Sequence, residues 1–292
     1  MHYDGPTYRP PTEAYTPLLQ ITVGCSYNQC AFCTMYRSTE FRMSPESEII
    51  EDLKEYYPYR DRVNRLFLLN GDPFVLSAEK LLRVAELVHQ YLPHVETMTC
   101  YCSIRDLRNK SFEDLVALRK AGYNQLYIGL ETGYEPALKF ITKGYTIPEA
   151  EHILREILDA GFDYHALLMN GIAGKGNTEA SVEVTARLLN KFKPKMVALL
   201  STAVSPGTPL ETMRDRGEYV ELTEREHIEE EIMLLKALNM DDDCFFFASH
   251  VFDKIPVSEY FSKKELIIRH LETEMAKMPA SELDSVWARG SI

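Results

Sequence analysis

The chain alternates short apolar runs with longer segments that begin on helix-capping signals. The apolar runs are nearly continuous, as expected for strands that are buried on both faces of a sheet. The strands are predicted at residues 19–23, 65–70, 96–104, 125–131, 164–170 and 196–200. The helices are predicted at residues 45–59, 77–92, 111–121, 146–160, 178–191 and 223–239. This alternation predicts βαβ units and therefore an α/β protein with a parallel sheet.

The helix boundaries rest on capping chemistry. Capping boxes, in which a Ser or Thr is followed three residues later by an acidic residue, open helices at Ser111, Thr146 and Thr223. Two helices end in the same Ala-Gly-aromatic junction, at residues 121–123 and 160–162, where glycine suits the C-terminal cap. The repeated junction indicates one structural unit that is used more than once.

The chain is predicted to divide into three parts. With 292 residues it is large enough for one big domain with a small appendage. Residues 1–18, rich in Pro, Tyr and Thr, are predicted to form an extended N-terminal arm, with a loose tail as the alternative. Residues 19–240 hold the six strand–helix units. Residues 241–292 are predicted to form a C-terminal extension with a strand at 244–251 and a helix at 262–277.

The charge balance argues against a nucleic-acid substrate. The chain carries 32 Lys and Arg residues against 44 Asp and Glu residues, which gives a net charge of −12. Proteins that hold nucleic acid neutralise its phosphates with basic side chains, and the sequence shows no basic run of that kind. A local basic patch is still compatible with this composition.

No segment indicates a membrane or a secretory destination. No apolar run approaches the ~20 residues that cross a bilayer, and the N-terminus lacks the basic flank and the apolar core of a signal peptide. The six cysteines, three of them clustered, suit a reducing compartment and a metal better than a disulfide framework. The sequence therefore predicts a cytoplasmic protein with no membrane partner.

Three cysteines stand together directly after the first predicted strand. Gly24 follows the strand, and Cys25, Cys30 and Cys33 follow Gly24. A structural zinc site usually takes four protein ligands, and the sequence supplies no second Cys-x-x-Cys and no nearby His pair. Three thiolates suit a four-iron cluster whose fourth iron is open to a small ligand. A zinc loop, or a set of buried structural cysteines, is the alternative.

With Phe32 immediately before the third cysteine, this loop resembles the radical S-adenosylmethionine (radical SAM) superfamily. The usual spacing of that superfamily is Cys-x3-Cys-x2-Cys, whereas the first gap here holds four residues. The resemblance implies a [4Fe-4S] cluster on Cys25, Cys30 and Cys33, and S-adenosylmethionine (SAM) as a cofactor that Phe32 contacts. It also implies a partial (β/α)6 barrel similar to a TIM barrel, with the active site at the carboxyl ends of the strands.

The turn after the second predicted strand, Asn70-Gly71-Asp72-Pro73, is similar to the Gly-Gly-Glu-like turn of the superfamily. The resemblance implies that Gly71, Asp72 and Pro73 hold the methionine amine of SAM. This version has one glycine instead of two, and Asp instead of Glu. A simple Gly-Asp-Pro turn is the alternative.

The segment after the fourth predicted strand resembles the Elp3-like and coproporphyrinogen-oxidase-like branches of the superfamily. It reads Gly-Leu-Glu-Thr-Gly over residues 129–133 and continues to Lys143 and Gly144. The resemblance implies that Glu131 accepts hydrogen bonds from the cofactor ribose and that Lys143 pairs with the cofactor carboxylate. A strand-end glutamate and a solvated lysine are the alternative.

A glycine-rich turn at residues 170–176 follows the fifth predicted strand. It lacks the Gly-Lys-Ser/Thr ending of a phosphate-binding loop, because Gly176 follows Lys175. The turn resembles the Gly-x-Ile-x-Gly motif of radical SAM cores. That resemblance implies that Gly171 and Ile172 pack against the adenine of SAM.

The remaining reactive residues are predicted to be mainly structural. Cys100, Cys102 and Cys244 are predicted to be core cysteines, with Cys100 and Cys102 on opposite faces of their strand. His250 is open between a core role and a substrate contact. The acidic run 229–231 is predicted to be a solvated helix face.

Together these features predict a radical SAM enzyme that acts on a small or medium-sized substrate. Reductive cleavage of SAM would give a 5′-deoxyadenosyl radical that abstracts a hydrogen atom, and the cluster is expected to be oxygen-sensitive. The implied protein partner is an electron donor such as flavodoxin or ferredoxin. The alternatives are a tRNA-modifying radical SAM enzyme, which the charge disfavours, and a zinc-stabilised α/β barrel that binds without catalysis.

Overall fold

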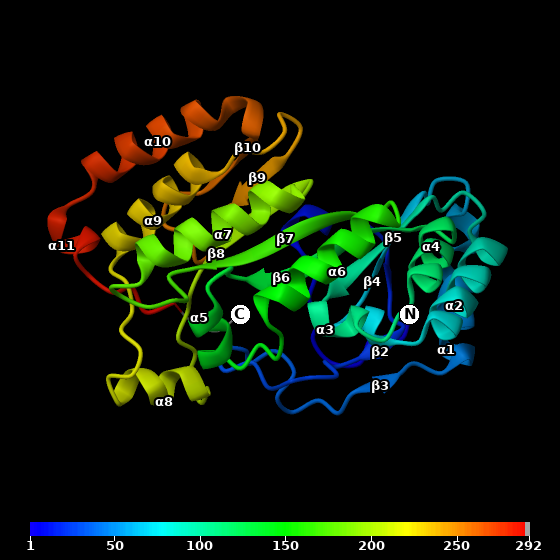
Figure 1. The fold of residues 1–292 in the computed structure, drawn as a ribbon. Helices are drawn as coiled ribbons and strands as arrows, with labels where there is room; N and C mark the ends of the chain where they lie inside the picture. The colour runs from blue at the N-terminus through cyan, green and yellow to red at the C-terminus, as the bar shows by residue number, and fades with distance from the viewer. Residues whose placement is uncertain (290–292) are drawn as a thin grey trace. The chain divides into compact units, whose positions relative to one another are not determined.

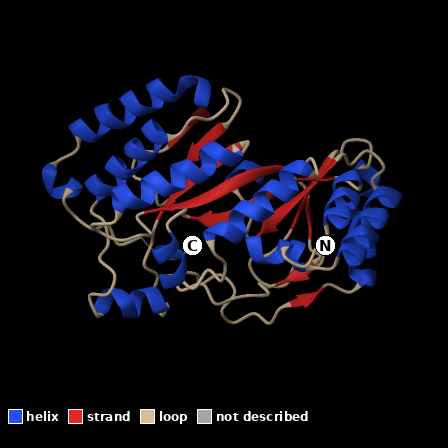
Figure 2. Cartoon of the chain, in the orientation of Figure 1, coloured by secondary structure: helices blue, strands red, loops and turns tan. Residues whose placement is uncertain are grey.

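The computed structural model describes residues 1–289 (Figure 1). The chain forms two compact units, each made of several stretches of sequence. The first unit comprises Met1–Asn28, Tyr36–Gly129 and His152–Tyr164. The second unit comprises Gln29–Met35, Leu130–Glu151 and the chain from His165 onward. Strands and helices alternate along the chain in both units (Figure 2).

The first unit is built on parallel strands in the order β1-β4-β5-β6. These strands are β1 (Leu18–Leu19), β4 (Arg65–Leu68), β5 (Thr97–Cys102) and β6 (Tyr123–Glu131), of which β6 runs on into the second unit. Most of their side chains are buried, which explains why the sequence shows apolar runs without clear alternation. A separate antiparallel pair consists of β2 (Thr22–Val23) and β3 (Arg42–Met43).

The helices of the first unit are α1 (Glu46–Tyr56), α2 (Ala78–Tyr91), α3 (Ile104–Leu107) and α4 (Phe112–Lys120). Helix α2 contacts both α1 and α4 and buries an apolar stripe that includes Leu81, Val84 and Val88. The hydroxyl of Tyr123 on β6 donates a hydrogen bond of 2.8 Å to the Leu81 carbonyl, and the Tyr123 ring packs on Phe74. This packing fixes the helix layer on the strands that end in the candidate site.

The second unit is built on β7 (Asp163–Asn170), β8 (Met196–Ser201), β9 (Phe245–Ala248) and β10 (Val257–Tyr260). Strands β7, β8 and β9 are parallel, and β10 pairs with β9 in the antiparallel sense. The helices are α5 (Glu135–Phe140), α6 (Ile147–Asp159), α7 (Thr178–Phe192), α8 (Pro209–Asp215), α9 (Glu224–Ala237), α10 (Lys264–Lys277) and α11 (Ala280–Leu283), and α6 ends in the first unit. Helix α9 packs against α7 and α10.

The first predicted strand is in fact two short strands. Residues Leu18–Leu19 pair with β4, and Thr22–Val23 pair with β3. The change of partner follows from a local bend, since the Ile21 carbonyl accepts a hydrogen bond from the Ser44 amide at 2.9 Å. The C-terminal region holds two strands, β9 and β10, where the sequence predicted one. Helices α3, α5, α8 and α11 were not predicted, because each is too short to show apolar periodicity.

The N-terminal residues are tied to the first unit by a buried carboxylate. A 3-10 turn at Pro11–Glu13 brings Glu13 against β4 and β6, where only 2% of Glu13 is exposed. Glu13 accepts hydrogen bonds from Arg65 Nε at 3.0 Å and from the Tyr127 hydroxyl at 2.7 Å. A buried charge is stable only when it is paired in this way, so these contacts fix the arm that precedes β1.

Among residues 1–289 the structure contains no helix long and apolar enough to cross a membrane. The cytoplasmic location inferred from the sequence stays a prediction.

Candidate metal and cofactor site

Three strands end in residues with left-handed backbone geometry. Asn70 two residues beyond β4, Glu131 at the end of β6 and Gly171 directly after β7 have φ values of 84°, 60° and 81°. For Asn70 and Glu131 this conformation is uncommon and costs free energy, and such residues cluster at functional sites. All three positions lie in turns that the sequence predicted to be cofactor-binding.

In the first unit, the turn after β4 packs directly against the backbone of the cysteine loop. The Gly71 amide donates a hydrogen bond of 3.0 Å to the Gly24 carbonyl. A Cβ atom on residue 71 would lie 2.6 Å from the Cys25 Cβ and 3.0 Å from the Tyr36 ring. Glycine at this position therefore makes room for Cys25.

Asp72 is buried and faces the residue after Cys25. Its Oδ1 accepts a hydrogen bond of 2.8 Å from the Ser26 amide, and its Oδ2 accepts one from the Ser26 hydroxyl. Burial raises the pKa of Asp72, while the Ser26 hydrogen bonds and the charge of Arg105 act in the opposite direction. In this structure both carboxylate oxygens are thus used to hold the cysteine loop.

In the second unit, the segment Gln29–Met35 carries Cys30 and Cys33 in a turn. The Cys33 amide donates a hydrogen bond of 3.2 Å to the Cys30 carbonyl, so the two residues stand on one tight loop. The Ala31 amide donates to the Ile141 carbonyl at 2.9 Å, and the Leu210 amide donates to the Ala31 carbonyl at 3.0 Å. The loop is therefore anchored at the end of α5 and at the start of α8.

Glu131 and Lys143 form a nearly buried ion pair. Lys143 Nζ lies 2.5 Å from Glu131 Oε1, and the side chains are 9% and 11% exposed. Burial by itself lowers the pKa of Lys143, but the charges of Glu131 and Cys30 outweigh it and raise that pKa, so Lys143 is a cation at neutral pH. Burial raises the pKa of the Cys33 thiol, and Lys143 counteracts this. The pair therefore shares its electrostatic environment with both cysteines of the turn.

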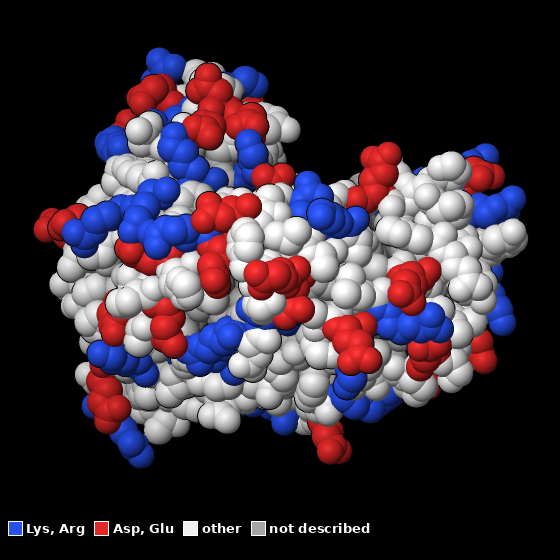
Figure 3. Space-filling model, turned by 45° about the vertical axis from the view of Figure 1, so that its right-hand side comes forward, with Lys and Arg blue, Asp and Glu red and all other residues white. Residues whose placement is uncertain are grey.

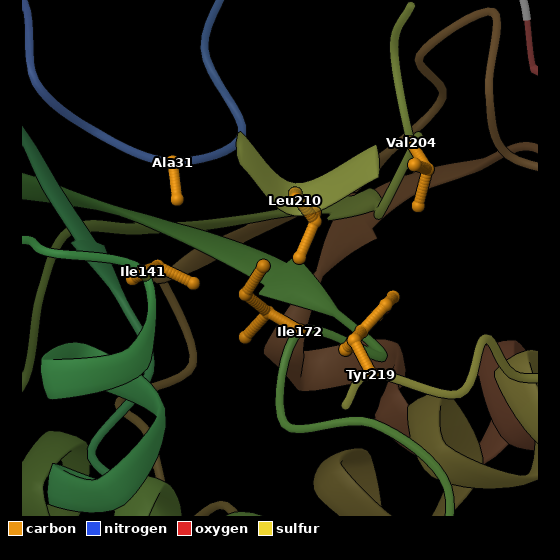
Figure 4. Packing of buried hydrophobic residues seen from close by; sticks show 6 residues of the cluster. All are labelled: Ala31, Ile141, Ile172, Val204, Leu210 and Tyr219. Atoms are coloured by element: carbon orange, nitrogen blue, oxygen red, sulfur yellow. The ribbon is translucent and has the colours of Figure 1, made fainter. Parts of the chain in front are cut away.

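An apolar cluster lies beside this loop (Figure 4). Its buried members are Ala31, Ile141, Ile172, Val204, Leu210 and Tyr219, and Phe32 packs against them. Two of the predicted cofactor contacts thus lie together, with Ile172 inside the buried cluster and Phe32 partly buried against it. Gly171 is also tightly packed, since a Cβ there would lie 2.5 Å from the His227 ring.

The donor set fits an iron–sulfur cluster. Cys25, Cys30 and Cys33 are half-buried thiols, and thiolates are the ligands that such clusters take. Lys143 supplies a buried positive charge near Cys30, where anionic thiolates need compensation. Within residues 1–289, no three His, Cys, Asp or Glu side chains are already drawn together around one metal position. Cys25 belongs to the first unit and the other two to the second, so the three-cysteine assignment stays a prediction.

The structure corrects two sequence-based interpretations. Cys100 and Cys102 lie on the same face of β5, because residues two apart in a strand share a face, and both are buried. Glu230 and Glu231 are buried rather than solvated, at 7% and 6% exposure. Glu230 accepts a hydrogen bond of 2.7 Å from the Gly171 amide, so the acidic run supports the turn after β7.

His250 and Cys244 contact residues that are close to them in the sequence. His250 Nδ1 accepts a hydrogen bond of 3.3 Å from the Phe252 amide and its ring packs edge-on against Phe252, while burial lowers the pKa of His250. Cys244 is buried beside β9. Sequence reasoning missed Arg105 at the start of α3 and His227 on α9, because their partners are distant in the sequence.

Residues 19–189, more than half of the chain, match the family model described as the radical SAM superfamily. The chain therefore belongs to the radical SAM superfamily, a family of enzymes whose cofactors are a [4Fe-4S] cluster and SAM. The family predicted from the cysteine loop is confirmed.

Two curated relatives agree with the predicted branch. A tRNA uridine(34) acetyltransferase of Methanocaldococcus jannaschii is 28% identical over 137 residues, which cover 46% of this chain and 24% of that protein. The heme chaperone HemW of Buchnera aphidicola subsp. Schizaphis graminum is 22% identical over 199 residues, which cover 65% of this chain and 52% of that protein. The chain thus has Elp3-like and HemW-like homologues, and it spans between a quarter and about half of their length.

The fold resembles that of a solved enzyme structure. The crystal structure of methylornithine synthase (PylB) superposes with a TM-score of 0.54 and 18% identity, over 91% of this chain and 82% of that one. At this identity the likeness concerns the fold. It confirms the predicted class, an α/β partial barrel with a mostly parallel sheet.

Proposed function

We propose that this chain is a radical SAM enzyme that acts on a small or medium-sized substrate and holds its cluster with Cys25, Cys30 and Cys33. The observation that carries the proposal is the buried ion pair of Glu131 and Lys143 beside Cys30 and Cys33. A buried pair is expensive to desolvate and is weak evidence for stability alone. Its position at the end of β6, in a left-handed turn, favours a functional role.

Different residues of the chain are proposed to bind different parts of the cofactors. When bound, the cluster and SAM supply a one-electron cleavage that yields a radical able to abstract hydrogen from the substrate. Lys143 offers a cation for the methionine carboxylate, and Glu131 offers oxygens for the ribose hydroxyls. The partly buried Phe32 offers an apolar face for adenine, Ile172 belongs to the buried cluster that Phe32 contacts, and Gly171 lets the backbone turn there. Gly71 and Pro73, in the turn after β4, are the remaining residues proposed to contact the cofactor.

The charge of the chain favours a small or medium-sized substrate. Basic and acidic side chains are interspersed on the face shown in Figure 3, and the net charge is −12. A tRNA-modifying enzyme is the second candidate, because one relative carries tRNA uridine(34) in its name. The chain covers 24% of that relative, and the charge favours a small molecule over tRNA. The family membership favours the enzyme over a zinc-stabilised binding module.

The proposed electron donor is a flavodoxin or a ferredoxin. The superfamily mechanism consumes one electron at a time, and these proteins carry single electrons at low potential.

The test is an anaerobic preparation analysed for metal and for turnover. We expect about four irons per chain, a brown chromophore, and formation of 5′-deoxyadenosine from SAM under reducing conditions. Cys33→Ala should lose the cluster, whereas Cys244→Ala should keep it. One colourless zinc per chain would contradict the proposal, as would a Cys33→Ala protein with a full redox-active complement of iron. Candidate substrates carrying deuterium would then reveal which hydrogen is abstracted.

A further inference from the structure

Arg105 contacts the cysteine loop directly. It stands at the start of α3, immediately beyond β5, and its guanidinium carbon lies 3.6 Å from the centroid of the Tyr27 ring. Tyr27 lies between Cys25 and Cys30 in the sequence. A guanidinium is flat and stacks on an aromatic face, which an ammonium group on a flexible stem does less well. The contact therefore fixes the orientation of Tyr27.

Arg105 also contacts the loop through Asp72. Arg105 Nη2 lies 4.0 Å from Asp72 Oδ2 and 3.6 Å from Asp106 Oδ1. Asp72 in turn accepts both hydrogen bonds from Ser26. One guanidinium thus acts on two successive loop residues, on Tyr27 by stacking and on Ser26 through the carboxylate.

The positive charge of Arg105 stabilises the buried carboxylates of Asp72 and Asp106. Asp72 and Asp106 are 2% and 3% exposed. Burial and the neighbouring Asp72 raise the pKa of Asp106 to about 7, and Arg105 and Lys110 counteract that rise. The Lys110 ammonium donates hydrogen bonds to the Phe74 and Asp106 carbonyls, at 2.5 and 3.2 Å. Arg105 is the basic side chain that lies beside Asp72.

We propose that Arg105 and Asp72 are positioning residues that clamp the loop after Cys25 and so fix the ligand geometry of the cluster. The inference rests on the proposed function, because it concerns the loop that would carry the cluster. It assigns Asp72 to the loop, since each Asp72 oxygen accepts a hydrogen bond from Ser26. Arg105 provides the flat cationic surface for Tyr27.

The test uses Arg105→Lys, Tyr27→Leu and the double variant, with Arg108→Lys as the control. Arg108 lies one turn along from Arg105 and is exposed. Each anaerobically reconstituted protein is measured for iron content, for the rate at which a ferrous chelator removes iron, and for the electron paramagnetic resonance spectrum of the reduced cluster. Circular dichroism checks the fold.

We expect Arg105→Lys and Tyr27→Leu to bind iron but to release it about 3- to 30-fold faster than wild type, as the loss of a stacked cation predicts. Their resonance spectra should shift, which a general loss of stability would not cause. The double variant should be no faster than the worse single variant, because both changes remove one interaction. Arg108→Lys should match wild type.

Arg105→Lys with the wild-type release rate and spectrum would overturn the clamp, and so would two effects that multiply in the double variant. The Asp72→Asn variant tests separately whether Asp72 holds the loop or binds the cofactor. The clamp predicts faster iron release, whereas wild-type iron release combined with weak SAM binding would assign Asp72 to the cofactor.

A measurement on the apo protein separates the two proposals. Arg105→Lys should make Cys25 react faster with an alkylating agent, because its loop is no longer held. If wild type binds no cluster but this difference persists, the proposed function fails and the loop clamp stands. An unchanged alkylation rate in a protein that does bind the cluster would contradict the clamp alone.

Discussion

At the scale of single residues, the ion pair of Glu131 and Lys143 defines the candidate cofactor site. The sequence predicted both residues as separate contacts to SAM, and the structure joins them to each other at 2.5 Å. The prediction was possible because the Gly-Leu-Glu-Thr-Gly phrase and the lysine are recognisable along the chain. The pairing was not predictable, since it depends on the left-handed turn at Glu131.

We expect Glu131→Gln and Lys143→Gln to keep the cluster and to bind SAM about 10- to 150-fold more weakly. The loss of one charge-assisted contact costs about 1.5–3 kcal/mol, and neither residue is a proposed cluster ligand. A titration of SAM against the cluster-loaded variants measures the effect. Lys139→Gln is the matched control, because Lys139 is an exposed lysine on α5.

If both variants bind SAM with wild-type affinity and lose only turnover, the proposed roles are wrong. Glu131 and Lys143 would then contact the substrate instead of the cofactor.

Arg105 shows where sequence reasoning stops at this scale. Its partners Tyr27 and Asp72 come from two loops that are distant from Arg105 in the sequence, and only the fold of the first unit brings them together. An arginine in the first turn of a four-residue helix carries no periodic or spacing signal. The structure was needed to distinguish it from a solvated side chain.

At the scale of elements, the turn after β4 controls the space available to the cysteine loop. We expect Gly71→Ala to lower iron content after reconstitution, because the added Cβ would lie 2.6 Å from the Cys25 Cβ. Overpacking of this kind typically costs about 1–3 kcal/mol. Iron analysis together with circular dichroism measures the effect separately from general unfolding.

Gly176→Asn is the control for that change. A Cβ at Gly176 meets no atom within 4 Å, and asparagine tolerates its positive φ better than most residues. Full iron in Gly71→Ala would show that the loop has more freedom than this packing allows.

Helix α9 carries a buried acid that makes stability depend on pH. Burial raises the pKa of Glu231 well above its ordinary value of 4.5, and the nearby Asp253 adds to the rise. Between pH 4.5 and the raised pKa of Glu231, the folded protein therefore holds more protons than the unfolded chain. The free energy of unfolding then falls as pH rises across that window, by at most about 1.4 kcal/mol per pH unit for this group.

We expect Glu231→Gln to flatten this slope and to be more stable than wild type at neutral pH. Denaturant unfolding of the apo protein at several pH values measures the slope, with the exposed Glu229→Gln as the control. Identical slopes in wild type and Glu231→Gln would show that Glu231 ionises normally in the folded state.

The long elements were predictable and the buried acids were not. Continuous apolar runs and capping boxes predicted strands such as β4 and β7 and helices such as α4 and α9. The run at 229–231 looked solvated because three adjacent acids usually face water. Two of them are buried, and Glu230 is stabilised by the Gly171 amide and the Thr178 hydroxyl, which belong to a turn and a helix distant in the sequence.

At the scale of the whole molecule, net charge is the property that bears on substrate choice. With 32 basic and 44 acidic residues, the chain should repel a polyanion. We expect no micromolar binding of transfer RNA at physiological salt, as measured by a filter or gel-shift titration at two salt concentrations. Tight binding that weakens steeply with salt would instead favour the tRNA-modifying alternative.

The ion pair at the end of β6 has a consequence for how the site selects its ligand. Under the proposed roles, Lys143 breaks its ion pair with Glu131 only when the methionine carboxylate of SAM replaces it. Binding of the cofactor therefore exchanges one anionic partner of Lys143 for another. An analogue that keeps the adenosine but lacks the amino-acid carboxylate has nothing to exchange, and Glu131 would retain the lysine. Glu131 would therefore compete with an incoming ligand for Lys143. Ligands that lack this carboxylate would be excluded from the site even when their adenosine fits it.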